Sequence, residues 1–145
     1  MKKTKVFFRF LVFVLLIAAT LTSTACAPTY NPTEANIVSR TELGEGAKTI
    51  VFLAVDKNNE AAMFTIHTDA TYLSEVLLAH NLVEGEDGPY GLMIHTVNGE
   101  KADYNVDGSY WAVWEEDAYS NYGVSSLEIK DGGCYSLVYT VYTAV

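Results

Sequence analysis

The segment from Asp103 to Gly108 carries residue types at a spacing that could bind a cation. Its sequence, Asp-Tyr-Asn-Val-Asp-Gly, matches the opening of a calcium-binding loop. Such a loop places a bidentate glutamate at its twelfth position, which here is Trp114, and Glu115 comes one residue late. The chain is also expected to enter a strand, not a helix, after Gly108. We therefore predict a polar turn that needs no calcium.

The remaining reactive side chains do not have the spacing of a catalytic or metal site. The histidines at 67, 80 and 95 share no ligand spacing, and zinc needs three or four ligands. The serines lack the context of a nucleophile elbow. The carboxylates from Glu115 to Asp117 could act as a hydrolytic pair, but a solvated turn at a strand end is the simpler interpretation. We therefore predict a protein that is not an enzyme and carries no metal and no obligatory cofactor.

The stretch from Tyr110 to Trp114 places three large aromatic side chains within five residues. Side chains alternate along a strand, so Tyr110 and Trp114 share one face, while Trp111 and Val113 share the other. One face must belong to the core. The other then displays aromatic rings, which suit a flat ligand, a sugar or a partner protein. Packing on both faces is the alternative. The candidate contact residues are Tyr90, Tyr104, Tyr110, Trp111 and Trp114.

Residues 1–25 have the pattern of a secretory signal. A basic region is followed by an unbroken apolar run from Phe10 to Ala19 and by small residues that lead to Cys26. This run is short for a membrane span, which needs about 20 apolar residues. The small residues before Cys26 resemble the lipobox of bacterial lipoproteins, in which the cysteine is acylated and becomes the first mature residue. The resemblance implies a lipid anchor on the extracytoplasmic face of the cell membrane. An ordinary secretory signal is the alternative.

Charge and cysteine content restrict the partners further. Four of the nine basic residues lie in the signal, which leaves five against 18 acidic residues and a mature net charge of −13. Such a surface repels phosphate backbones, so nucleic acid is excluded as a partner. The chain has only two cysteines, Cys26 and Cys134. A lipid on Cys26 would leave no internal disulfide, so Cys134 is expected to be a small core residue.

The elements that position these residues can be predicted from apolar periodicity. Residues 26–47 contain proline and glycine but no sustained apolar period, which predicts a flexible tether. The domain follows at 48–145. Its first part is a predicted hairpin of 49–56 and 61–68. A helix over 73–80, capped at Thr71 and stopped at Asn81, follows, and then a loop over 82–91.

The second part of the domain is expected to consist of strands. A strand over 92–97 meets Asn98-Gly99, a strong hairpin turn, and 100–105 returns beside it. Asp107-Gly108 turns the chain into a strand over 109–115. A short strand over 126–130 and a long closing strand over 134–143 complete the domain. This order predicts an α+β, β-grasp-like fold, with one helix packed on a mixed sheet.

Several short motifs carry a resemblance that covers residues 48–142. They are Tyr90-Gly91, Val97-Asn98-Gly99, Tyr110-Trp111, Gly123-Val124 and Lys130-Asp131-Gly132. Their order is similar to that in a family of bacterial surface lipoproteins related to the C-terminal β-domain of transcobalamin and intrinsic factor. The resemblance implies a ligand-binding module, with a corrinoid as the candidate ligand and Trp111 nearer the ligand than Trp114. A cell-surface domain that binds protein or carbohydrate, without any cofactor, is the alternative.

Overall fold

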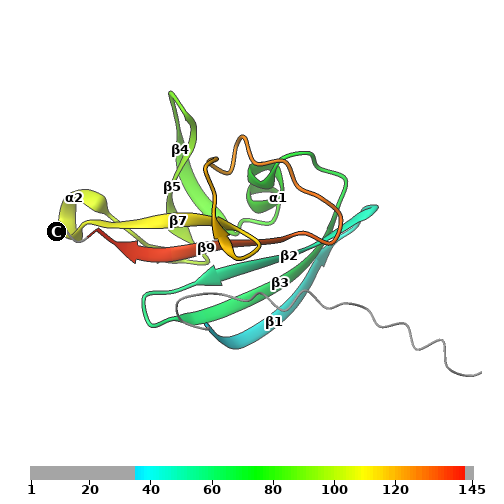
Figure 1. Ribbon diagram of the computed structural model, residues 1–145, viewed down its shortest axis with the longest axis horizontal. Coiled ribbons are helices and arrows are strands. Elements are labelled where there is room, and N and C mark those ends of the chain that lie inside the picture. The colour runs from blue at the N-terminus through cyan, green and yellow to red at the C-terminus, as the bar shows by residue number, and fades with distance from the viewer. Residues whose placement is uncertain (1–34, 143–145) are drawn as a thin grey trace, which may run out of the picture.

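The computed structural model describes residues 35–142 and is dominated by β-sheet (Figure 1). The predicted anchor residue Cys26 lies outside the described residues. The architecture is mixed α/β, with strands in the majority and two short helices. In chain order the elements are β1 (Asn36–Gly44), β2 (Lys48–Val55), β3 (Glu60–Thr68), α1 (Leu73–Ala79), β4 (Val83–Gly88), β5 (Gly91–Val97), β6 (Glu100–Lys101), α2 (Tyr104–Asp107), β7 (Ser109–Glu115), β8 (Ala118–Tyr119) and β9 (Cys134–Val141).

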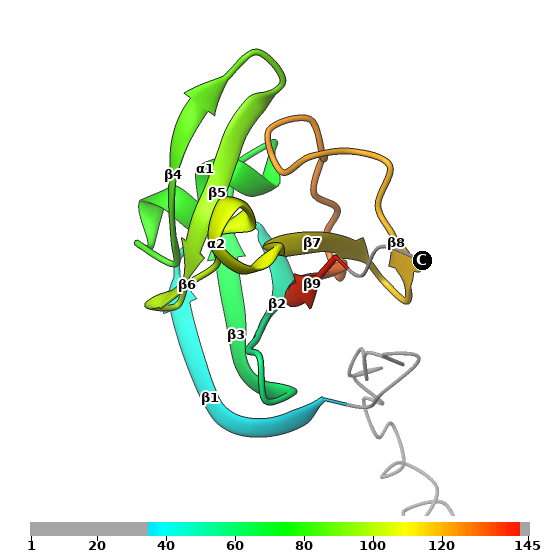
Figure 2. The ribbon, with the colours of Figure 1, turned by 90° about the vertical axis from the view of Figure 1, so that its left-hand side faces the viewer.

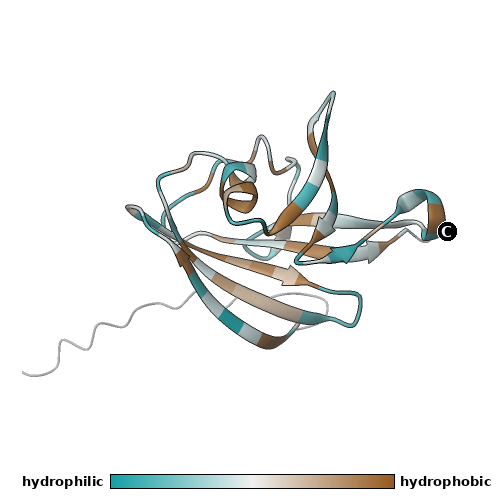
Figure 3. Ribbon diagram, turned by 180° about the vertical axis from the view of Figure 1, so that it is seen from behind, coloured by the Kyte–Doolittle hydropathy of each residue, from teal (hydrophilic) through white to brown (hydrophobic). Residues whose placement is uncertain are grey.

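The main sheet has six strands in the order β1-β3-β2-β9-β7-β8. Its centre is the predicted hairpin, in which β2 and β3 pair antiparallel and Phe52 stands opposite Phe64. The other side of β2 pairs in parallel with the closing strand β9, and β7 then pairs antiparallel with β9. The apolar runs of these strands explain their central place, because a strand buried on both faces reads as a continuous hydrophobic segment (Figure 3).

The larger hydrophobic core lies on one face of this sheet, beneath α1 and a smaller sheet of order β4-β5-β6. Leu73, Val76 and Leu77 are fully buried there, as the helical spacing predicts. The helix begins at Leu73 as expected, but its N-cap is Tyr72 and not Thr71. Glu75 closes the first turn by accepting the backbone N–H groups of Thr71 and Tyr72, each at 2.9 Å. The hairpin of β4 and β5 projects beyond the main sheet (Figures 1 and 2).

Two strands occupy segments that were predicted to be irregular. The tether prediction is wrong for 36–44, because this segment pairs in parallel with the edge of β3 and forms β1. The loop prediction is wrong for 83–88, which forms β4 and pairs with β5 across a bulge at Glu84 and Gly85. In both cases the strand is held by backbone hydrogen bonds, and its side chains carry no apolar alternation to reveal it.

Two predicted strands are shorter or absent in the structure. The segment 126–130 forms no strand and contributes only an isolated bridge between Tyr72 and Glu128. The returning strand after Asn98-Gly99 is confined to β6, and residues from Tyr104 onward turn into α2. Asp103 accepts a hydrogen bond from the Asn105 N–H at 3.1 Å and so caps this short helix. Gly108, at φ 74°, ends it in the left-handed conformation that glycine adopts without strain.

Neither helix within residues 35–142 is long and apolar enough to cross a membrane.

Candidate functional site

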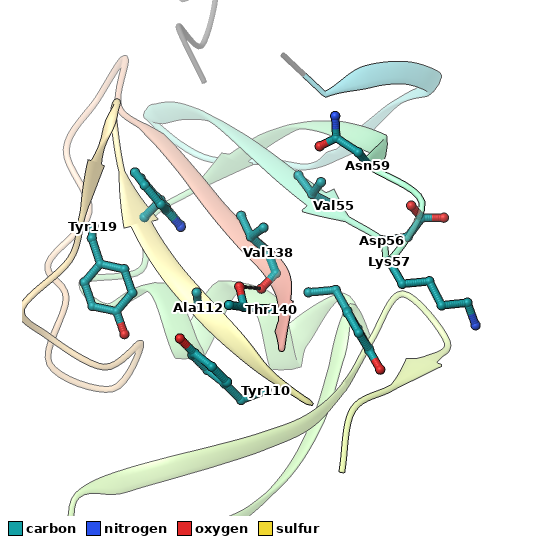
Figure 4. Close-up of a pocket in the computed structure, with 11 residues that line it drawn as sticks. Val55, Asp56, Lys57, Asn59, Tyr110, Ala112, Tyr119, Val138 and Thr140 are labelled. Atoms are coloured by element: carbon teal, nitrogen blue, oxygen red, sulfur yellow. Dashed lines mark hydrogen bonds between the residues drawn. The ribbon is translucent and has the colours of Figure 1, made fainter. Parts of the chain in front are cut away.

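A groove of about 440 Å³ lies on the face of the main sheet opposite α1 (Figure 4). We call it the aromatic groove. It runs along β7 and reaches the turn between β2 and β3 across the intervening strand β9. Its lining residues are Val55, Asp56, Lys57, Asn59, Tyr110, Ala112, Trp114, Tyr119, Val138, Tyr139 and Thr140. The volume falls within the range of small-molecule sites, which is roughly 300–1,000 Å³.

Strand alternation builds the walls of this groove. Tyr110, Ala112 and Trp114 point to the same face of β7, as predicted from the sequence. Trp114 pairs in register with Tyr119 of β8, and their rings meet edge to face at 5.9 Å and 77°. Ala112 and its partner Val138 are small and buried, so they form a floor between the aromatic walls. The strand geometry separates Tyr110 from Trp114 by about 13 Å, at about 3.3 Å per residue.

The rim of the aromatic groove is polar and close to neutral. Asp56 accepts hydrogen bonds at 2.8 Å from the backbone N–H groups of Asn58 and Glu60. The ammonium group of Lys57 lies 3.1 Å from Glu100, and the hydrogen bond to this carboxylate raises the pKa of Lys57. Because each charge has a partner nearby, the rim offers hydrogen-bonding groups without a large net charge.

Trp111 occupies the opposite face of β7 and belongs to the main core. It is 7% exposed, its indole N–H donates to the carbonyl of His95 at 3.3 Å, and its ring meets Tyr139 at 5.5 Å in a T-shaped arrangement. Trp111 is therefore the more buried of the two tryptophans, whereas the resemblance implied that Trp111 would be the more accessible one. The physical reason is that the smaller sheet and α1 cover the face that carries Trp111, while the face that carries Trp114 keeps an open groove.

The other two predicted contact residues, Tyr104 and Tyr90, lie outside the aromatic groove. Tyr104 lies in α2, is 58% exposed and has its ring 6.3 Å from that of Tyr142. Tyr90 is 96% exposed at the turn between β4 and β5 and does not line the aromatic groove. Of the five predicted residues, only Tyr110 and Trp114 meet in this groove.

Sequence reasoning missed Tyr119 and the polar rim as parts of this groove. Tyr119 carried a weak signal, because it follows the turn at Glu116 and Asp117 and so can stand opposite Trp114. Glu116 has a positive φ of 55° in that turn. The sequence of the rim residues after β2 predicts only a turn, and it does not predict that this turn lies beside the aromatic groove. Their place beside the aromatic strand depends on the insertion of β9 between β2 and β7, which is a long-range feature of the sheet.

The carboxylates of the calcium-like segment serve the local backbone. Asp103 caps α2, and Asp107 accepts the N–H of Ser109 at 2.9 Å. Hydrogen bonds from Ser109 hold the pKa of Asp107 below its ordinary value. Across residues 35–142, no three His, Cys, Asp or Glu side chains are grouped so that they could hold a metal ion.

Cys134 departs from its predicted role. It begins β9 and is 2% exposed, as expected for a core position, but it is disulfide-bonded. The prediction of a cysteine that acts only as a small core residue is therefore wrong. Because the chain has just two cysteines, a disulfide within the chain and a lipid on Cys26 exclude each other.

Part of the sequence matches a known domain family, and the fold is similar to that of solved structures. Residues 69–133 match the family described as Domain of unknown function (DUF4430). The structure of haptocorrin in complex with Cbi is similar in fold, with a TM-score of 0.52 and 15% identity, over 70% of this chain and 27% of that chain. No curated protein matches.

A second solved structure is more similar in sequence. It is the crystal structure of a candidate metal binding protein from Ruminococcus gnavus ATCC 29149, with 32% identity and a TM-score of 0.64. The match covers 67% of this chain and all of that chain. At this identity over the full length of the relative, the chain belongs to the family of the Ruminococcus gnavus protein, and it carries the DUF4430 domain.

Proposed function

We propose that this protein is a ligand-binding module whose ligand lies in the aromatic groove against Tyr110, Trp114 and Tyr119. The observation that carries the proposal is the groove itself. Three aromatic side chains from two neighbouring strands stand over a floor of small residues, with polar groups on the rim. Tyrosine and tryptophan are rigid and amphipathic, so they provide contact area at a low cost in conformational entropy. The proposed module binds its ligand and does not transform it.

The first candidate ligand is a corrinoid. Support comes from the fold shared with haptocorrin, whose structure was solved with Cbi, and from the aromatic walls, which suit a flat ring. The groove is open, so a ligand larger than its volume could lie with one edge inside it. The arrangement also supports assignment to the β-grasp class, because one main helix packs on a mixed sheet whose central strands β2 and β9 are parallel.

The second candidate function is carbohydrate or protein recognition without a cofactor. The polar and nearly neutral rim favours it. A saccharide presents hydroxyl groups that pair with carboxylate, amide and hydroxyl groups of this kind. Metal binding, the property in the name of the Ruminococcus gnavus protein, is not part of the proposal for residues 35–142, because their carboxylates and histidines are dispersed.

We further propose that the chain is exported and held at the extracytoplasmic face of the membrane by a lipid on Cys26. The basic residues, the apolar run and the small residues before Cys26 support this proposal. Two acyl chains give stable anchoring where a single chain is marginal. A disulfide between Cys26 and Cys134 is the alternative to this anchor, because the Cys26 thiol cannot be both acylated and cross-linked. Mass spectrometry of the mature chain distinguishes an acylated Cys26 from a cross-linked one.

Titration of the purified, detergent-solubilised chain tests the binding proposal. Cyanocobalamin and cobinamide would be added while tryptophan fluorescence and corrinoid absorbance are recorded. We expect saturable binding that is lost in Trp114→Ala and kept in the matched control Tyr90→Ala, whose side chain is solvated outside the groove. Binding that survives Trp114→Ala would place the ligand elsewhere. The absence of binding to both probes would remove the corrinoid from consideration.

A further inference from the structure

A second groove of about 410 Å³ lies next to the aromatic groove, and the two share Tyr110. We call it the hairpin groove, because it lies between the base of the β4–β5 hairpin and α2. Its lining residues are Glu86, Met93, Ile94, His95, Lys101, Ala102, Asp103, Tyr104, Asn105, Ser109 and Tyr110. Met93 and Tyr104 are 67% and 58% exposed, so each presents apolar surface to solvent inside this groove.

Tyr110 lines both grooves, and each groove contains one further tyrosine near it. Burial raises the pKa of Tyr110, and the nearby phenols of Tyr119 and Tyr104 raise it further. Tyr119 belongs to the aromatic groove and Tyr104 to the hairpin groove. Trp114 extends the row beyond Tyr119, and Tyr142 extends it beyond Tyr104. The aromatic side chains therefore follow one another across β8, β7 and α2.

We propose that the two grooves form one elongated cleft that binds a linear oligosaccharide of neutral or amino sugars. This inference rests on the proposed function and extends it to a second subsite and a class of ligand. The C–H-rich faces of pyranose rings pack on aromatic rings, and a chain of such rings can follow a row of aromatic side chains. The spacing of about 13 Å between Tyr110 and Trp114 requires a ligand longer than one sugar ring.

The polar groups along the cleft suit sugar hydroxyls. The aromatic groove offers Asp56 and Thr140, and the hairpin groove offers Asp103 and Asn105. Carboxylate and amide groups accept and donate the paired hydrogen bonds that neighbouring hydroxyls require. Several of the charges are already compensated, since Lys57 pairs with Glu100 and Lys101 lies 3.4 Å from Asp103. Hydrogen bonding therefore contributes more to recognition than charge does.

The charge of the whole chain narrows the class of saccharide. The chain has a net charge of −9, or −13 without residues 1–25, and such a field repels uronic acids and phosphate-bearing polymers.

The test is isothermal titration of the purified full chain with two oligosaccharide series, each from the disaccharide to the hexasaccharide. One series is β-1,4-linked N-acetylglucosamine and the other is α-1,4-linked glucose. For at least one series we expect affinity to rise with length until both grooves are occupied. Tyr119→Ala should weaken all lengths, whereas Tyr104→Ala should remove only the gain of the longer oligomers. The expected loss is at least about tenfold, as for truncation of an aromatic contact residue.

Tyr90→Ala is the matched control, and melting temperatures of all variants check that they fold. Tyr104 is largely solvated, so its truncation should leave the fold intact. Oligosaccharide binding that Tyr104→Ala leaves unchanged at every length would overturn the elongated cleft but leave the aromatic groove as a site. If no oligosaccharide binds while a corrinoid binds in a Trp114-dependent way, the saccharide inference fails and the proposed function stands. If neither class binds, both fail.

Discussion

Replacing the two tryptophans of β7 one at a time should separate packing from binding. Trp111 lies in the main core, where it contacts Tyr139 and donates to the carbonyl of His95. Truncating a buried tryptophan to alanine costs about 3–5 kcal/mol. Small domains have a free energy of unfolding of about 5–15 kcal/mol, so Trp111→Ala should lose a large share of it.

A conservative variant separates the ring from its hydrogen bond. Trp111→Phe keeps an aromatic ring in the core and removes the indole N–H. The carbonyl of His95 still accepts the N–H of Ala102 at 2.8 Å, so it does not become an unsatisfied buried group. The hydrogen bond alone is then worth about 1 kcal/mol, and the smaller ring adds a packing loss. Trp111→Phe should therefore fall between the wild type and Trp111→Ala.

Trp114→Ala should cost much less stability. Its side chain is half-buried on the wall of the aromatic groove, where its ring meets that of Tyr119. An aromatic pair of this kind contributes about 0.5–1.5 kcal/mol beyond its buried area. Urea unfolding followed by circular dichroism measures both variants, with the change read from the midpoint at constant slope. Equal and severe destabilisation by Trp111→Ala and Trp114→Ala would refute the assignment of one tryptophan to the core and one to the groove.

Three further predictions concern the anchor, the calcium-like segment and the first turn of α1. Cys26→Ser should release the protein from the membrane or leave an unprocessed precursor, and unchanged fatty-acid labelling would contradict lipidation at that residue. A chelator should leave the melting temperature unchanged, because Asp103 and Asp107 already accept hydrogen bonds from backbone N–H groups. If millimolar calcium stabilised the protein and Asp103→Ala abolished this effect, the segment would be a calcium site. The pKa of Glu75 lies below its ordinary value of 4.5, because the N–H groups of Tyr72 and Thr71 donate to the carboxylate. The Glu75 carboxylate therefore contributes its full stabilisation above pH 4.5, and this stabilisation is lost as the pH falls through the lower pKa of the folded state. Glu75→Gln should make the free energy of unfolding less dependent on pH in this acidic range. An unchanged pH dependence would contradict this role of Glu75.

Local patterns in the sequence were enough to predict the centre of the fold. The apolar runs before and after the turn at Lys57 give the β2–β3 hairpin, and the helical spacing of Leu73, Val76 and Leu77 gives α1. The side chains of these elements are buried in the core, so the spacing of their apolar residues indicates which element forms and which of its faces is buried. Asn98-Gly99 gave a further turn correctly, with both residues at positive φ.

Elements held mainly by backbone pairing could not be predicted in the same way. Most side chains of β1 are exposed, and its place depends on the free edge of β3, to which it pairs in parallel. The strand β4 reads Val-Glu-Gly-Glu-Asp-Gly, a composition typical of a loop, and becomes a strand because β5 stands beside it. Such pairings depend on a partner strand elsewhere in the chain, so the local sequence does not predict them.

The candidate site was predicted in part for the same reason. Alternation along β7 correctly separated Tyr110 and Trp114 from Trp111. Which of these faces belongs to the main core depends on where the smaller sheet packs, and that position is set by segments far from β7 in the chain. Alternation along β7 therefore predicts which side chains share a face, but it does not predict which face is covered by other elements.

The most direct test of the ligand site uses the two tryptophans of the chain as internal reporters. Each indole N–H gives one cross-peak in a proton–nitrogen NMR spectrum, and Trp111→Phe assigns them. A corrinoid or oligosaccharide that binds in the titrations would be added to the labelled protein. The account predicts that the Trp114 peak moves in a saturable way while the Trp111 peak, from the core, stays in place. A ligand that saturates the protein without moving the Trp114 peak would show that the aromatic groove is not its site.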